Sequence, residues 1–103
     1  MKVEKQKRLE AKGWKVTTVA EFLSLTEEEE RIVELRLALS DAIKERRVES
    51  NLTQKNFAKL LQSSQSRVAK MESGDPSVSI DLLIRSLFKA GVDRRKLSKI
   101  VAA

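Results

Sequence analysis

The sequence predicts an all-α protein, and three patterns in it support this fold class. Apolar residues recur at spacings of three and four along several segments, which is the period of a helix with one buried side. Residues that favour helix starts precede these segments, and glycine follows some of them. No segment keeps the strict alternation of apolar and polar residues that a half-buried strand requires. We therefore expect five helices in the body of the chain and a helical extension before them.

Composition restricts the classes of function. The chain has 103 residues, of which 41% are hydrophobic, enough for one domain with a compact core. It contains neither Cys nor His, so we expect no disulfide, no metal site and no cofactor, and the commonest general base is missing. The remaining polar residues form no spacing typical of an activated nucleophile, so we predict no enzyme.

Charge and hydropathy indicate the kind of partner. A net charge of +6 favours an anionic partner, either nucleic acid or a membrane surface. Apolar runs are too short to span a membrane and no signal-peptide pattern opens the chain, so we expect a cytoplasmic protein without a membrane partner. Residues 1–15 carry six Lys or Arg against two acids, whereas residues 16–34 carry six acids against one Arg.

The first part of the chain is predicted to be an extension, residues 1–25, packed on a domain formed by residues 26–103. A short helix can form before Gly13, and Trp14 and Phe22 can pack the extension onto the body. Thr26 and Glu29 then form a capping box that starts the longest helix, expected to end near Arg47. The main apolar stripe of that helix is expected to contain Ile32, Leu35, Leu39 and Ile43.

Residues 53–73 read as two short helices joined by a tight turn. Thr53 is the expected N-cap of the first helix, and Leu52 and Phe57 form a hydrophobic staple around it. Ser64 is the expected N-cap of the second helix, which Gly74 ends in a left-handed conformation. The apolar side of the first helix is expected to hold Phe57, Ala58, Leu60 and Leu61, and that of the second Val68 and Met71.

Two further helices are expected after this pair. Ser79 caps the first of them, whose apolar positions are Ile80, Leu83, Ile84, Leu87 and Phe88, and Gly91 terminates it. Asp93 caps the last helix, whose apolar face is formed by Leu97, Ile100 and Val101.

The helix pair resembles the helix-turn-helix of the XRE family, the Cro and phage-repressor type. The resemblance rests on Thr53-Gln54, Phe57-Ala58, Ser64-Gln65-Ser66, Val68, Met71-Glu72 and Gly74, and extends to Gly91-Val92. It implies a five-helix, lambda-repressor-like DNA-binding domain. The chain departs from the family in the turn, where Gln62-Ser63 replaces a glycine and an aliphatic residue. A non-glycine residue at positive φ there is strained by roughly 1 kcal/mol.

The second helix of the pair is the expected recognition helix. Its outward-facing residues are Gln65, Ser66, Arg67 and Lys70. Gln can form paired hydrogen bonds with adenine and Arg or Lys can bond guanine, so these residues are predicted to contact DNA bases. The predicted contacts with the DNA backbone are Gln54, which resembles the family's phosphate-binding glutamine, together with Lys55, Lys59 and Ser64. Lys55 and Lys59 can equally be solvated charges. Glu72 is expected to bond within the protein.

The leading hypothesis is a sequence-specific transcriptional repressor that binds two DNA half-sites as a homodimer. The predicted dimer contact is the face of Leu97, Ile100 and Val101, which can instead pack on the domain's own core. The extension resembles that of small regulators encoded beside RelE- or HigB-like toxins, which implies a HigA-type antitoxin whose toxin contacts would include Arg8, Trp14 and Phe22. A phage-like or housekeeping repressor without a toxin, and a protein-binding helical adaptor that does not bind DNA, are the alternatives.

Overall fold

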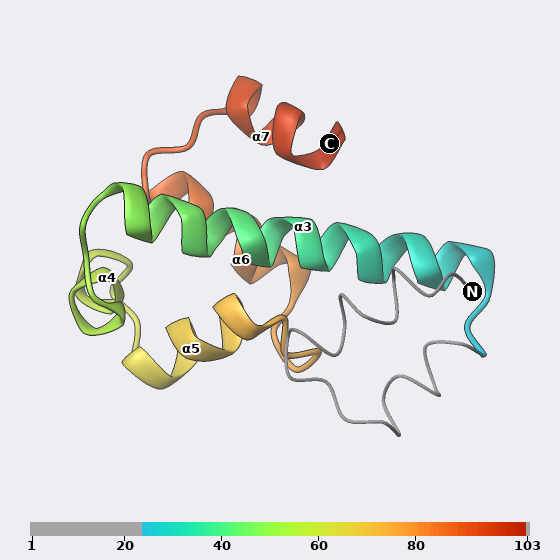
Figure 1. Ribbon diagram of the computed structural model, residues 1–103, viewed down its shortest axis with the longest axis horizontal. Coiled ribbons are helices and arrows are strands. Elements are labelled where there is room, and N and C mark those ends of the chain that lie inside the picture. The colour runs from blue at the N-terminus through green and yellow to red at the C-terminus, as the bar shows by residue number, and fades with distance from the viewer. Residues whose placement is uncertain (1–23, 103) are drawn as a thin grey trace. The chain divides into compact units, whose positions relative to one another are not determined.

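The computed structural model describes residues 24–102, and all regular structure within that range is helical (Figure 1). Five helices are present there, which confirms the predicted all-α fold. They are α3 (Glu27–Glu49), α4 (Gln54–Leu60), α5 (Gln65–Ser73), α6 (Ile80–Lys89) and α7 (Arg94–Ala102). The bounds agree with the sequence prediction to within about two residues, the usual uncertainty of helix ends.

The chain divides into two compact units, residues 1–34 and 35–103, and the division falls within α3. In the first unit, α3 begins with the predicted capping box. The backbone N–H of Glu29 donates to Thr26 Oγ1 and the N–H of Thr26 donates to Glu29 Oε1, both at 3.2 Å. Ile32 was wrongly predicted to be buried, since half of its surface is exposed. Leu35 is the first residue of α3 that packs against the hydrophobic core of the second unit. The predicted apolar stripe of α3 therefore began one helical turn too early, at Ile32.

One hydrophobic core holds the second unit together. Its buried members come from every helix of the unit except α7 and from the loops that flank α6: Leu39, Ala42, Ile43, Phe57, Ala58, Leu61, Val68, Met71, Val78, Leu83, Leu87, Ala90 and Val92. Leu97 and Ile100 of α7 are partly buried against this core. The fold therefore fixes α4, α5 and α6 against α3 through side chains that exclude water.

Two of the predicted core positions are largely exposed. Leu60 and Phe88 expose 51% and 44% of their surfaces, so their predicted burial is wrong. Helix α4 has only seven residues, and Phe57, Ala58 and Leu61 already occupy its contact with the core. Phe88 follows the fully buried Leu87 and lies beside the core-facing side of α6.

Residues with positive φ end four of the helices. Asn51, Gln62, Gly74 and Gly91 have φ values of 57°, 56°, 75° and 92°. At each end, the N–H of the residue that follows donates a hydrogen bond to a carbonyl of the last helical turn. Examples are Leu52 N–H to the Arg47 carbonyl (3.2 Å) and Ser63 N–H to the Ala58 carbonyl (2.8 Å). The strained conformation predicted for the turn is confirmed at Gln62, whereas Asn51 was not recognised as a helix end.

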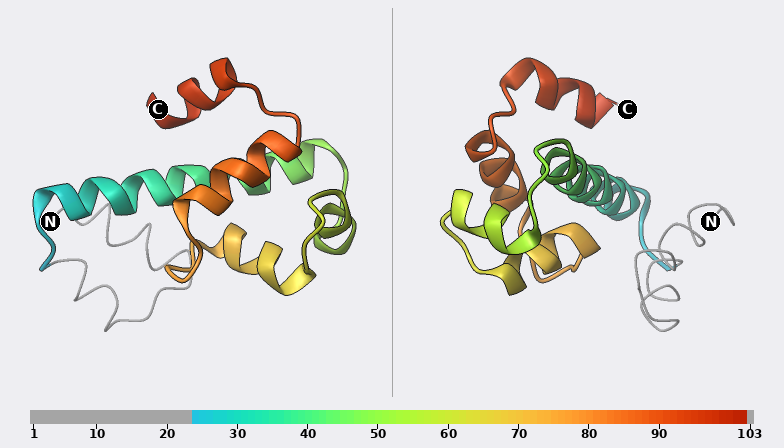
Figure 2. Two further views of the ribbon diagram at one scale, coloured as in Figure 1. Left: turned by 180° about the vertical axis from the view of Figure 1, so that it is seen from behind. Right: turned by 60° about the vertical axis from the view of Figure 1, so that its left-hand side comes forward.

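Helices α5 and α7 lie on opposite sides of the layer formed by α6 and the part of α3 in the same unit (Figures 1 and 2). Helix α4 lies on the side of α5. The arrangement gives the second unit two separate surfaces, one formed by α4 and α5 and one by α7.

Candidate DNA-binding surface

Helix α5 is oriented by two buried residues and one cap. Val68 and Met71 have no exposed surface, so they fix one side of the helix against the core. Ser64 has the extended conformation of an N-cap, and its Oγ accepts the N–H of Arg67 at 3.2 Å. Both features were predicted from the sequence.

The opposite side of α5 is exposed. It carries the four side chains predicted to contact bases, Gln65, Ser66, Arg67 and Lys70, and all four are exposed to solvent. They occupy the first two turns, the part of a recognition helix that reaches base edges. The structure therefore brings these residues together on one accessible surface, while their contact with bases stays a prediction.

Helix α4 supplies the predicted backbone contacts. Thr53 caps it by accepting the N–H of Asn56 at 3.1 Å, and Phe57 fixes its inner side. Gln54 is partly buried at the first helical position, whereas Lys55 and Lys59 are exposed. Ser64 stands between this helix and α5, with its hydroxyl already bonded as the α5 cap.

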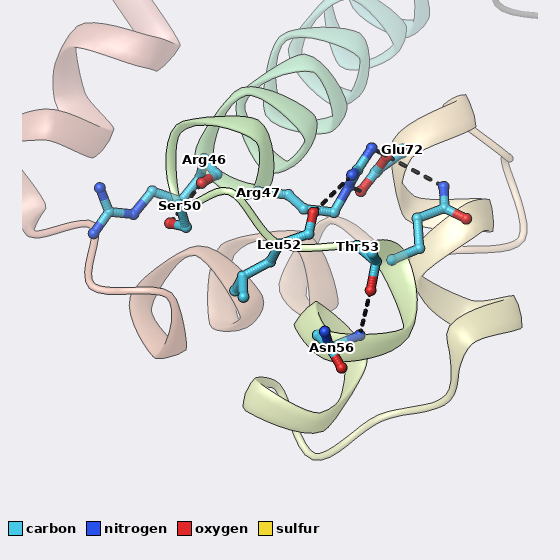
Figure 3. A network of polar contacts seen from close by, with 8 residues as sticks. Arg46, Arg47, Ser50, Leu52, Thr53, Asn56 and Glu72 are labelled. Carbon is cyan, nitrogen blue, oxygen red and sulfur yellow. Dashed lines mark hydrogen bonds and ion pairs between the residues drawn. The ribbon is translucent and has the colours of Figure 1, made fainter.

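The carboxylate of Glu72 joins three elements (Figure 3). Arg47, near the end of α3, donates to both carboxylate oxygens of Glu72, with Nε···Oε2 at 2.7 Å and Nη2···Oε1 at 3.0 Å. Arg47 Nη1 also donates to the carbonyl of Leu52 at 3.0 Å, and Gln54 Nε2 donates to Glu72 Oε1 at 3.3 Å. The prediction that Glu72 bonds within the protein is confirmed.

This ion pair is largely shielded from water. The side chains of Arg47 and Glu72 are 17% and 5% exposed. The hydrogen bond to Glu72 raises the pKa of Arg47 above its ordinary value, although burial acts in the opposite direction. A two-pronged guanidinium–carboxylate pair is directional, so it sets the angle between α3 and the end of α5 and holds the start of α4 beside them.

A polar groove separates α5 from the start of α6. It has a volume of about 510 Å³ and is lined by Ser64, Ser66, Arg67, Lys70, Ser77, Val78, Ser79, Leu82 and Arg85. Ser77, Ser79 and Arg85 were not predicted to belong to the functional surface. Sequence spacing identified Ser79 only as a helix cap, which it is, since its Oγ accepts the N–H of Leu82 at 3.1 Å. Arg85 lies 18 residues after Arg67, and only the fold brings them to one groove.

The predicted dimer face on α7 has two kinds of residue. Leu97 and Ile100 pack partly against the core of their own domain, whereas 48% of the surface of Val101 is exposed. An apolar groove beside α7 is lined by Phe88, Arg94, Leu97, Ser98, Val101 and Ala102. Phe88 of α6 therefore extends the apolar face that the sequence assigned to α7 alone.

The predicted partner-binding residues, Arg8, Trp14 and Phe22, lie outside the described residues. Within residues 24–102 no cluster of His, Cys, Asp or Glu side chains has the arrangement needed to hold a metal ion. The same part of the chain contains no helix that is long and apolar enough to cross a membrane.

A comparison with protein families gives a match over the region that contains α4 and α5. Residues 43–85 match the family described as Helix-turn-helix, of the XRE type. This part of the chain is therefore similar to a helix-turn-helix. The match begins at the end of α3 and includes α4, α5 and the first half of α6, so it suggests DNA binding and transcription regulation. It does not support the HigA-type antitoxin subtype. No curated protein and no solved structure matches the chain.

Proposed function

We propose that this protein is a sequence-specific DNA-binding repressor that acts as a homodimer on two half-sites. The observation that supports it is the composition of the exposed side of α5. This side carries polar and cationic side chains and no acidic one. The helix contains one acid, Glu72, and that carboxylate is bonded to Arg47. Such a helix can enter the major groove without electrostatic repulsion from its own side chains.

Direct recognition is assigned to α5. In this proposal Gln65 bonds an adenine, Arg67 and Lys70 bond acceptors of guanine, and Ser66 contacts either base type. Gln54, Lys55, Lys59 and Ser64 contact phosphates and thereby fix the register of α5 on the duplex. The hydrogen bond from Gln54 to Glu72 holds the Gln54 side-chain amide in place at the start of α4 in the absence of DNA.

Dimerisation is assigned to the apolar face of α7. A single recognition helix reads only a few base pairs, so two copies on related half-sites raise specificity. Val101 and Phe88 are the exposed apolar side chains of this face. Leu97 and Ile100 of the same face are partly buried against the core. A dimer bound over a promoter would repress by excluding the polymerase.

The toxin partner remains a prediction from the sequence. It depends on Arg8, Trp14 and Phe22, which lie outside the described residues, and on a resemblance of the extension rather than of the helix-turn-helix. The described surface neither requires such a partner nor blocks one.

Selection of duplexes from a pool of random sequence tests the proposal. We expect the protein to enrich one motif, and Arg67→Ala to enrich a motif that is less defined at one position. The matched control is Lys44→Ala, which removes an exposed cation of α3 outside the groove beside α5. Failure of the folded protein to enrich any sequence, or to bind duplex DNA at low salt, would favour the adaptor instead.

A further inference from the structure

The groove between α5 and α6 has the composition of an anion-binding site. Its lining includes three cations, Arg67, Lys70 and Arg85, and four serines, but no carboxylate. The cations come from both walls, with Arg67 and Lys70 on α5 and Arg85 on α6. Hydroxyl and guanidinium groups on two sides of one groove can surround the oxygens of a phosphate.

The arginines of this domain fall into two groups. Three arginines of α3 are used by the fold: Arg36 donates to the carbonyl of Val78, Arg46 Nε donates to the carbonyl of Ala90 at 2.8 Å, and Arg47 binds Glu72. Arg85, in contrast, is exposed and forms no hydrogen bond or ion pair with any residue in the range that the structure describes. Its charge is therefore available to a ligand.

The acids closest in sequence to the groove, Asp75 and Asp81, do not line it. Asp75 Oδ1 accepts the backbone N–H of Ser77 at 2.8 Å, and hydrogen bonds from Ser77 lower the pKa of Asp75 below its ordinary value. Lys70 lowers the pKa of Asp75 further by electrostatic attraction, as a smaller effect. Asp81 is exposed on α6 but does not line the groove. Asp75 thus holds the loop that carries Ser77 by accepting its backbone N–H.

We propose that this groove receives the sugar-phosphate strand that borders the major groove entered by α5, and that Arg85 is a phosphate contact from α6. The inference rests on the proposed function, because α5 must first be in the major groove. The groove shares Ser66, Arg67 and Lys70 with the recognition surface, so a strand that follows this surface meets Arg85 on the other wall. A guanidinium matches phosphate geometry through two parallel hydrogen bonds.

The test is the salt dependence of DNA affinity for the full chain and three variants. Fluorescence anisotropy would measure binding to a mixed-sequence duplex of about two helical turns over a range of salt concentrations. Arg85→Gln should reduce the slope of log affinity against log salt by about 0.9 for each protomer bound, the value expected for one lost phosphate contact. Arg85→Lys should retain most of the slope.

The matched control is Arg95→Gln on α7. It removes one exposed cation from the surface on the other side of α3 and α6, so it has the same effect on net charge (Figure 2). A slope for Arg85→Gln equal to that for Arg95→Gln would overturn the inference. So would a change of base preference with an unchanged slope, which would make Arg85 a base contact. Thermal unfolding of all three variants establishes that they are folded.

The two proposals fail in different ways. If the unaltered chain binds no duplex at any salt concentration, the proposed function is wrong. If it binds DNA and Arg85→Gln behaves like the control, only the assignment of the groove is wrong.

Discussion

At the residue scale, the most consequential interaction is the pair of Arg47 and Glu72. It is bidentate, with its shorter contact at 2.7 Å, and its carboxylate also accepts the amide of Gln54. Each partner lies on a different helix from the other, so the pair ties the end of α3 to the end of α5. An exposed ion pair of equal length would contribute much less, because solvent screens it.

Glu72→Gln should lower the free energy of unfolding by about 2–4 kcal/mol, because it leaves the shielded guanidinium of Arg47 without its counter-charge. Glu49→Gln is the matched control. It removes a carboxylate that is 57% exposed and lies 3.9 Å from Arg46 and Lys96, so the expected change is below about 1 kcal/mol. Urea unfolding followed by circular dichroism measures both. Equal losses in the two variants would contradict the importance assigned to the shielded pair.

At the element scale, cap residues determine where the helices begin. Thr53, Ser64 and Ser79 each accept the N–H of the residue three positions later, at 3.1 to 3.2 Å, and all three were recognised from sequence. Helix ends were harder to predict. Gly74 and Gly91 were recognised because glycine favours positive φ, whereas Asn51 adopts the same conformation without that signal. The side chain that closes α4 is Lys89, which donates to the carbonyl of Leu61 from 28 residues further along the chain.

The apolar face of α7 gives a prediction at the same scale. Val101→Asp should convert the proposed dimer to a monomer, because a carboxylate would be buried in the contact, while the fold should be retained since Val101 is about half exposed. Light scattering measures the mass. Ser98→Asp is a weaker change in the same groove, and Lys44→Asp on α3 is a control outside it. A dimer of unchanged stability in Val101→Asp would mean that the contact lies elsewhere.

At the scale of the whole molecule, the fold separates structural cations from available ones. Sequence alone gave a net charge of +6 and could not say which cations were used internally. Arg36, Arg46 and Arg47 bind carbonyls or a carboxylate of distant segments. The cations of α5, and Arg85 of α6, remain directed to solvent. Exposed cations are also present on α7, among them Arg94 and Arg95, so the proposal places DNA on the side of α5 because the groove there is lined by cations and serines without a carboxylate.

The helix pair itself was predictable because its determinants are local. Caps, the spacing of Phe57 and Leu61, and the outward side of α5 depend on residues within one or two turns of each other. The groove with Arg85 and the partial exposure of Phe88 and Leu60 were not predictable in this way. They depend on how α6 lies against α5 and on how much of a short helix the core can cover, which are properties of packing between elements.

The measurement that tests the central claim most directly compares the relative affinities of the full chain and Arg67→Ala for a selected duplex and its single-base-pair variants. If α5 recognises bases, Arg67→Ala should lose about 1–3 kcal/mol of affinity for the preferred duplex. It should lose discrimination at one position in each half-site and keep it at the others. A loss of affinity that is uniform over all sequences would contradict the claim, because Arg67 would then contact only the DNA backbone.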